Sequence, residues 1–268
     1  MKKTTFFLVM CLTIMNTNAQ RKDSLFFSRN EHMYKPGLSR TDLSQMIREK
    51  NEKIRSLKIP TILITYGFLA LENDNLKALN NSIKNEMQED HPFFSTKIDD
   101  YLQYAPALTV YGLNAMGIKG RNNFRDRTMI YLLSNMMLTT TVFSVKKLSQ
   151  QLRPDGSNYY SFPSGHTAEA FASAEFLYQE YKNVSPWYGM AGYAMAAATG
   201  YLRMYNNKHW LGDVIAGAGI GILSTKAAYW IYPIIKRTLF KDKPVNTMIM
   251  PRYQNGTAGI SLIYCFTH

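Results

Sequence analysis

Apolar stretches alternate with polar segments along most of the chain. In order, the apolar stretches are 59–71, 98–118, 128–145, 183–202 and 214–235. Their length, and the absence of the apolar–polar alternation of strands, predict that they are helices. The first has 13 residues, fewer than the about 20 that a helix needs to cross a bilayer. The stretch 128–145 is either a transmembrane helix or a buried core helix.

Three smaller signals refine this picture. Thr41 and Asp42 are suited to cap a surface helix within the polar segment 21–58. Gly217 and Gly221 are four residues apart, a spacing that allows close helix packing. Near the C-terminus, Asn255-Gly256 separates two strand-like segments and predicts a β-hairpin. The expected fold class is therefore mainly α, with a small C-terminal β-hairpin.

The N-terminus has the layout of a secretory signal peptide. Lys2 and Lys3 precede a mostly apolar segment, 6–15, and the small or polar residues Thr17-Asn18-Ala19 follow it. Cleavage is expected after Ala19, and a buried N-terminal helix is the alternative. We expect four parts: a signal peptide (1–19), a polar helical lead-in (20–97), a catalytic helical domain (98–240) and the hairpin (241–268).

The net charge and the cysteine content limit which binding partners and metal sites are expected. The net charge is +12, and a basic exported protein meets anionic partners: phosphorylated lipids, an anionic membrane surface or nucleic acid. Composition does not choose among them. Of the two cysteines, removal of the signal peptide would take Cys11 and leave Cys265 alone. An internal disulfide and a cysteine-based metal site are then both excluded.

Three short motifs carry the candidate chemistry. Each has an ordinary explanation when it stands alone: a solvated helix end, a loop before a helix, or an i,i+4 pair on a helix. Their joint occurrence in this order is much harder to attribute to chance. The motifs are Lys146 to Arg153-Pro154, then Pro163-Ser164-Gly165-His166, then Arg203, His209 and Asp213.

A metal-free phosphoryl-transfer site needs cations, a nucleophile in line and an acid for the leaving group. Lys146, Arg153 and Arg203 supply the cations. A helix expected over 167–181 would place Ser164 and Gly165 at its N-terminus, where free N–H groups bind anions.

The two motif histidines divide the remaining roles. His209 and Asp213 are four residues apart, so they share one helix face, and the carboxylate can fix the ring for nucleophilic attack. His166 is then the candidate general acid.

The combination Lys-x6-Arg-Pro, Pro-Ser-Gly-His and Arg-x5-His-x3-Asp resembles the signature of the type 2 phosphatidic acid phosphatase family. Its superfamily includes class A acid phosphatases and vanadium haloperoxidases. The motifs span 146–213, and the helical pattern extends the likeness to about 98–235. The chain looks most like exported lipid phosphatases of Bacteroides-like bacteria. It departs from the pattern at Leu202, where the family usually has Ser.

The resemblance implies a helical bundle and a phosphohistidine intermediate on His209. It assigns phosphoryl binding to Lys146, Arg153, Arg203, Ser164 and Gly165, leaving-group protonation to His166, and support of His209 to Asp213. It implies a metal-independent phosphoric monoester hydrolase without a cofactor. The remaining histidines are scattered along the chain and form no metal cluster in the sequence: His32, His91 and His268.

The expected function is hydrolysis of phosphorylated membrane lipids, such as lipid A, phosphatidylglycerophosphate, phosphatidate or undecaprenyl pyrophosphate. We expect an exported, membrane-associated enzyme whose active site faces the periplasm, with an anionic membrane surface and no nucleic acid as partner. The alternatives are a soluble periplasmic acid phosphatase, favoured by a mean hydropathy of −0.23, a vanadium haloperoxidase, or an inactive anion- or lipid-binding protein. The sequence does not indicate the oligomeric state.

Overall fold

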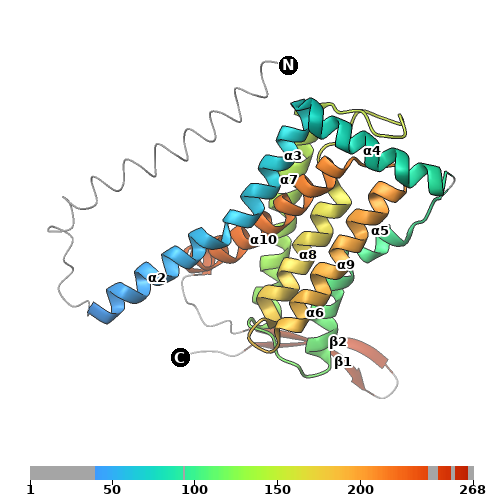
Figure 1. Cartoon of the computed structure of the whole chain (residues 1–268). Coiled ribbons are helices and arrows are strands. Elements are labelled where there is room, and N and C mark those ends of the chain that lie inside the picture. Colours follow the sequence, from blue (N-terminus) through green and yellow to red (C-terminus); the bar gives the residue numbers. More distant parts are fainter. Residues whose placement is uncertain (1–39, 93, 241–246, 255–256, 265–268) are drawn as a thin grey trace. The chain divides into compact units, whose positions relative to one another are not determined.

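The computed structural model describes residues 40–92, 94–240, 247–254 and 257–264. The predicted signal peptide therefore lies outside the described residues. The described chain is mainly helical, as the hydrophobic pattern predicts (Figure 1). Its helices are α2 (Arg40–Ser56), α3 (Lys58–Glu72), α4 (Asp74–Asp90), α5 (Ile98–Leu102), α6 (Ala105–Ala115), α7 (Phe124–Ser149), α8 (Gly165–Tyr181), α9 (Pro186–Tyr205) and α10 (Leu211–Phe240).

Local residues explain where the helices differ from the apolar stretches. The stretch 98–118 is divided into α5 and α6, because Pro106 lies in the first turn of α6 and lacks the N–H that a continuous helix would need. Helix α7 extends beyond 128–145 at both ends. Asn123 caps its start by accepting a hydrogen bond from the Asp126 N–H at 2.8 Å. Gln150, with φ of 45°, ends it in the left-handed conformation.

Helix α8 lies at the centre of the packing. Its alanines at 168, 170, 172 and 174 are all fully buried. Helices α7 and α9 run antiparallel to it. Val142 of α7 lies near Gly165, and Tyr131, three turns earlier in α7, stacks on Phe176. Small residues allow the close approach of α9, since a Cβ on Gly200 would lie 3.4 Å from the Thr167 side chain.

Helix α10, in contrast, runs parallel to α8. A Cβ added at Gly217 would lie 2.6 Å from the Ser164 carbonyl oxygen, and one at Gly221 would lie 2.1 Å from that of Ala168. The close packing predicted from this glycine pair is therefore confirmed. Because the two helices are parallel and in close contact, their N-termini lie together.

Three helical segments are long and apolar enough to cross a membrane: Ser44–Glu72, Phe124–Ser149 and Leu211–Thr238. The first reaches this length because α2 precedes the short apolar stretch at 59–71. On α7, Leu132, Met136 and Phe143 are more than half exposed. Contact of these side chains with lipid has no free-energy penalty, whereas their exposure to water is unfavourable.

The chain divides into two compact units at Ala228, and every residue of the site below belongs to the first unit. In the second, β1 (Thr247–Gln254) and β2 (Thr257–Tyr264) pair antiparallel, with Thr247 opposite Tyr264 and Gln254 opposite Thr257. The turn residues Asn255 and Gly256 lie outside the described residues, so the predicted hairpin as a whole stays a prediction.

Candidate active site

The N-termini of α8 and α10 meet at the second and third motifs of the sequence. The Ser164 N–H donates to the Asp213 carbonyl oxygen at 3.0 Å, which joins the second motif to the third. Ser164 also caps α8: its Oγ accepts from the Thr167 N–H at 3.4 Å. Gly165, half-buried, is the first residue of α8. Two helix N-termini at one point create a positive potential that suits an anion.

His209 and Asp213 form a buried pair at this point, only 3 % and 1 % exposed. The His209 Nδ1 lies 3.4 Å from Asp213 Oδ2. The same oxygen accepts hydrogen bonds from the Ser161 hydroxyl at 2.5 Å and from the Trp210 N–H at 3.0 Å. These donors fix the carboxylate in place, so it holds one ring nitrogen of His209 and leaves Nε2 available.

The three predicted cations interact electrostatically with this pair. Burial lowers the pKa of His209 to about 4, and the charges of Lys146 and Arg203 act in the same direction against Asp213. The pKa of Arg153 is lowered by burial and then by Arg203. Such effects weaken as the distance between the charges grows. Lys146 and Arg203 therefore lie near His209, and Arg153 lies near Arg203 and Asp213.

The two guanidinium groups among these cations have hydrogen-bond donors without a partner among the described residues. The Nε atoms of Arg153 and Arg203 are buried and have no hydrogen-bond partner among the described residues. An unpaired buried donor is destabilising, and an anion bound between these two groups would supply the missing acceptors. An oxyanion such as phosphate fits, because guanidinium groups bind its oxygens directly.

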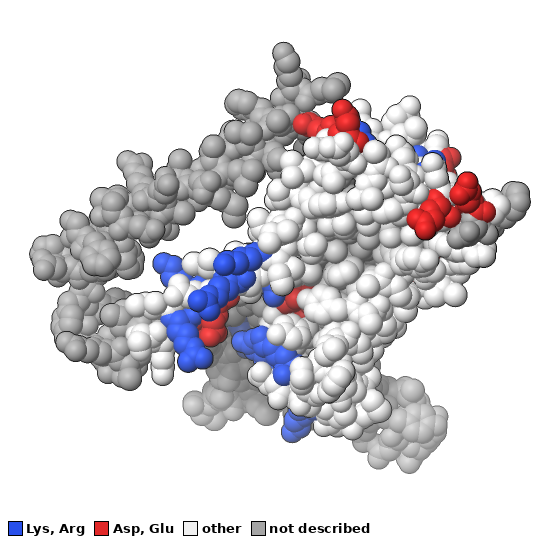
Figure 2. Space-filling model, in the orientation of Figure 1, with Lys and Arg blue, Asp and Glu red and all other residues white. Residues whose placement is uncertain are grey.

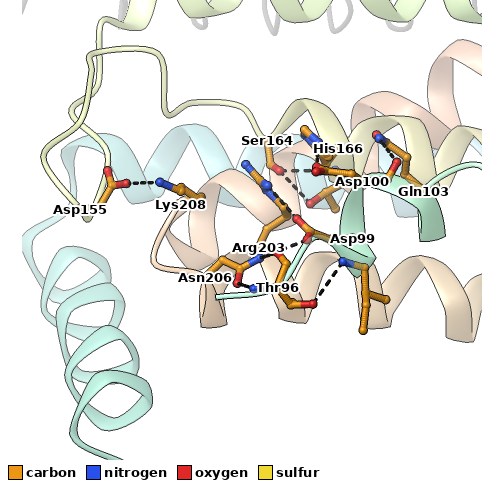
Figure 3. Close-up of polar contacts among 12 residues, drawn as sticks. Thr96, Asp99, Asp100, Gln103, Asp155, Ser164, His166, Arg203, Asn206 and Lys208 are labelled. Atoms are coloured by element: carbon orange, nitrogen blue, oxygen red, sulfur yellow. Dashed lines mark hydrogen bonds and ion pairs between the residues drawn. The ribbon is translucent and has the colours of Figure 1, made fainter. Parts of the chain in front are cut away.

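The loops that carry the motifs are tied to one another. Lys146 Nζ donates to the carbonyl oxygens of Tyr160 and Ser161 at 2.6 and 3.3 Å. Trp210 Nε1 donates to the Leu152 carbonyl at 2.9 Å. Lys208 and Asp155 form an ion pair at 2.7 Å (Figure 3). These contacts fix the first motif against both of the others.

Helix α5 contributes two residues that sequence reasoning missed. Asp99, fully buried, accepts from Arg203 at 2.7 Å. Asp100 Oδ1 lies 2.8 Å from His166 Nε2, and Figure 3 shows the two side chains turned towards each other. The sequence shows Asp99 and Asp100 only as acidic residues at a helix start. Ser161, just before the second motif, was missed for the same reason: its partner Asp213 is 52 residues away.

One group of side chains has the composition of a metal site. Among the described residues, Asp99, Asp100 and His166 offer ligand atoms within 4.8 Å of one another. These atoms already have partners, since Asp99 binds Arg203 and Asn206 while Asp100 binds His166. The cation Arg203 occupies the place that a metal ion would take beside Asp99. The donor set therefore fits an ion-pair network better than a metal centre.

Comparisons with known proteins identify the family of this chain. A sequence model of the PAP2 superfamily matches residues 63–237. A lipid A 1-phosphatase from Porphyromonas gingivalis is 39% identical over 165 residues, which are 61% of this chain and 36% of that protein. This chain thus spans about a third of the length of that relative.

Two crystal structures resemble the fold. A transmembrane PAP2 type phosphatidylglycerolphosphate phosphatase from Bacillus subtilis has a TM-score of 0.48 at 19% identity, over 67% of this chain and 98% of its own. Aquifex aeolicus LpxE has a TM-score of 0.41 at 22% identity, over 55% of this chain and 93% of its own.

Proposed function

Because the chain belongs to the PAP2 superfamily, we propose that it is a metal-independent phosphatase of membrane lipids that forms a phosphohistidine on His209. One observation carries this proposal. The buried His209–Asp213 pair lies where two helix N-termini meet, beside two buried guanidinium Nε atoms that have no partner. This is the environment that a phosphoryl group needs while its bonds change.

The first half-reaction follows from the contacts of His209. Its lowered pKa keeps the imidazole neutral near pH 7, so Nε2 retains the electron pair that attacks phosphorus. The bond from phosphorus to the leaving oxygen breaks, and that oxygen takes a proton from His166. Asp213 stabilises the positive charge that develops on the ring, while Lys146, Arg153 and Arg203 neutralise the phosphoryl oxygens.

The second half-reaction restores the enzyme. Water attacks the phosphohistidine and transfers a proton to His166, which lost its own in the first step. The P–N bond breaks, inorganic phosphate leaves and His209 is again neutral. Ser164 and the N–H groups at the start of α8 bind the phosphoryl oxygens throughout, because the helix dipole favours negative charge there.

The substrate class is a phosphorylated lipid. The 39% identical relative is a lipid A 1-phosphatase, which makes lipid A 1-phosphate the first substrate to test. Three membrane-length apolar helices favour a lipid over a water-soluble ester. Phosphatidylglycerophosphate, phosphatidate and undecaprenyl pyrophosphate present the same phosphoryl group on other lipids.

Charge distribution supports an active site on the periplasmic side. Apart from the cations of the site, Lys and Arg side chains also gather at the opposite ends of the helices: Lys53 and Arg55 end α2, and Lys182 at the end of α8 lies near Arg121 and Lys226. Figure 2 shows Lys and Arg side chains gathered on one part of the visible face, with a few acidic side chains among them and others at the upper and right edges of the molecule. Basic flanks of membrane helices stay in the cytoplasm, which leaves the opposite end, with the site, in the periplasm.

This orientation constrains the predicted signal peptide. Gly67 and Ala70, near the C-terminal end of α3, pack on Gly212 at the start of α10, so α3 runs towards the site. A leader cleaved after Ala19 would deliver the start of α3 to the periplasm. If α3 then crossed the bilayer, the site would face the cytoplasm. A cleaved leader and a periplasmic site are compatible only if α3 does not cross.

Phosphate release from a panel of substrates tests the activity. The panel is lipid A, phosphatidylglycerophosphate, phosphatidate, undecaprenyl pyrophosphate and a water-soluble aryl phosphate, each with and without EDTA. We expect EDTA-insensitive release that is fastest from a lipid, and an acid-labile phosphoenzyme that is absent in His209→Ala. The exposed residue His91 provides the matched control, His91→Ala, which should keep full activity. Full hydrolysis by His209→Ala would refute the nucleophile.

Accessibility of single cysteines tests the orientation. In a Cys11→Ser, Cys265→Ser background, Asn75→Cys at the start of α4 should react with a membrane-impermeant maleimide in spheroplasts. Lys119→Cys, near the opposite end, should react only after lysis. The reverse pattern would place the site in the cytoplasm.

A further inference from the structure

Both histidines of the site have a carboxylate partner, but the two partners differ in origin. Asp213 is one helical turn from His209, as the sequence predicts. Asp100 is 66 residues from His166 and comes from α5, outside all three motifs. The contact between Asp100 Oδ1 and His166 Nε2 is 2.8 Å long, shorter than the 3.4 Å between His209 Nδ1 and Asp213.

Helix α5 is held firmly enough to place this carboxylate. Asn206, at the end of α9, binds Thr96 twice: its Oδ1 accepts from the Thr96 N–H and its Nδ2 donates to the Thr96 carbonyl, both at 3.0 Å. Asn206 Nδ2 also donates to Asp99 at 3.1 Å, and Arg203 donates to Asp99 at 2.7 Å. Figure 3 shows these contacts beside the Asp100–His166 pair.

The contact also fixes the protons of the ring. An ionised carboxylate only accepts hydrogen bonds, so Asp100 requires a hydrogen on His166 Nε2. Nδ1 is then the ring nitrogen that exchanges a proton with the leaving oxygen. We propose that Asp100 positions His166 as the acid and that its charge disfavours substrates whose leaving group carries a second phosphate. This inference rests on the proposed phosphatase function.

Monophosphates and diphosphates differ in whether their leaving group needs a proton from His166. A phosphate monoester of a neutral alcohol expels an alkoxide, which must take a proton as the P–O bond breaks. A diphosphate expels a phosphate ester, whose second pKa is about 6, so it departs without needing that proton. It also brings negative charge beside Asp100, whose side chain is 46% exposed. The site therefore suits monophosphates.

The surroundings of His166 make Asp100 necessary. Burial and then Arg203 of α9 lower the pKa of His166, whereas Asp100, and more weakly Asp99, raise it. Tyr104, at the start of α6, lies near both Asp100 and Glu169 of α8, and burial followed by these two carboxylates raises its pKa above the ordinary value. Without the Asp100 carboxylate, the imidazolium form would be populated only at lower pH.

The test compares Asp100→Asn with a matched control. Asp74→Asn removes a carboxylate from α4 whose contact is an exposed ion pair with Lys77, so it should leave activity unchanged. Asp100→Asn should lower kcat about 10- to 100-fold for an alkyl monophosphate but less than threefold for p-nitrophenyl phosphate, whose leaving group needs little acid. The alkaline limb of its pH profile should move to lower pH.

Two further measurements separate positioning from a structural role. In a His166→Ala background, Asp100→Asn should have no additional effect on kcat, because Asp100 acts through His166. The ratio of kcat/KM for undecaprenyl pyrophosphate to that for undecaprenyl phosphate should rise at least about tenfold in Asp100→Asn. The monophosphate loses the acid that its leaving group needs, and the pyrophosphate no longer meets the charge of Asp100.

The outcomes are decisive for this inference alone. Equal losses for alkyl and aryl substrates, additive losses in the double variant, or an unchanged diphosphate to monophosphate ratio would each overturn it. None of these results would affect the phosphohistidine on His209, which is tested separately by the His209→Ala variant.

Discussion

Gly217→Ala should separate stability from activity, because it acts on the contact between the two helices that form the site. The added Cβ would lie 2.6 Å from the Ser164 carbonyl oxygen and 3.3 Å from the Ala168 nitrogen, both backbone atoms. Backbone cannot rotate away as a flexible side chain can. If ordinary contact begins near 3.4 Å, α8 and α10 must separate by about 0.8 Å at Ser164.

The two consequences differ in size. Overpacking of this kind destabilises by about 1–3 kcal/mol, and the better helix propensity of alanine offsets about 1 kcal/mol of that. The net loss of stability is therefore about 0–2 kcal/mol. A displacement approaching 1 Å between catalytic groups lowers the rate by about 100-fold, because it moves Ser164 and His166 away from His209. We expect a near-normal unfolding temperature with a large loss of kcat.

Two other glycines provide the comparison. Gly112→Ala in α6 meets no atom within 4 Å, so it should stabilise by up to about 1 kcal/mol and leave kcat unchanged. Gly221→Ala, with a contact of 2.1 Å to the Ala168 carbonyl oxygen, should destabilise more than Gly217→Ala. The measurements are thermal unfolding in detergent and kcat with an aryl phosphate. Wild-type kcat in Gly217→Ala would refute the reasoning that helix separation sets the site geometry.

Three more outcomes follow from buried charges. The pKa of His209 is about 4 in the folded protein, against an ordinary value of 6.5. The stability that neutral His209 contributes is therefore present above pH 6.5 and is lost as the pH falls towards 4, by on the order of 3 kcal/mol. The free energy of unfolding of His209→Asn, measured against pH, should lack this dependence. Glu180→Ala leaves Arg127 buried without its ion-pair partner and should destabilise by about 3–5 kcal/mol in denaturant titrations. Arg153→Gln should weaken inhibition by inorganic phosphate about 10- to 100-fold in steady-state assays, because one charged hydrogen-bonding group is lost; unchanged inhibition would show that Arg153 does not contact the phosphoryl group.

Hydrophobic patterning predicted the helices well because their signals are local. The apolar stretches at 128–145 and 214–235 lie inside α7 and α10, and the ends of α7 follow from the Asn123 cap and the left-handed Gln150. The break between α5 and α6 required attention to Pro106, which the length of the apolar stretch concealed. The apolar stretch at 59–71 has only 13 residues and is by itself too short to cross a membrane. The segment Ser44–Glu72 is long enough because α2 extends it, and the hydropathy of the short stretch does not reveal this extension.

The sequence predicts those parts of the candidate site whose residues are close together along the chain. His209 and Asp213 are four residues apart on a helix, so their pairing follows from helix geometry. The partners supplied by α5 depend on tertiary packing instead: Asp99 meets Arg203 across 104 residues, and Asp100 meets His166 across 66. No local pattern distinguishes these two aspartates from acidic residues that merely favour a helix start.

The balance of charge in the site explains why α5 belongs to it. Among the described residues at the phosphoryl site, the cations Lys146, Arg153 and Arg203 face the carboxylates Asp213 and Asp99, which leaves one net positive charge. The N-termini of α8 and α10 add about half a charge each, so the site presents about two positive charges. A phosphate monoester dianion matches this value, whereas without Asp99 the excess would favour a more highly charged anion. In the proposed mechanism Asp99 sets the charge of the phosphoryl site, and Asp100 places negative charge where the leaving group departs.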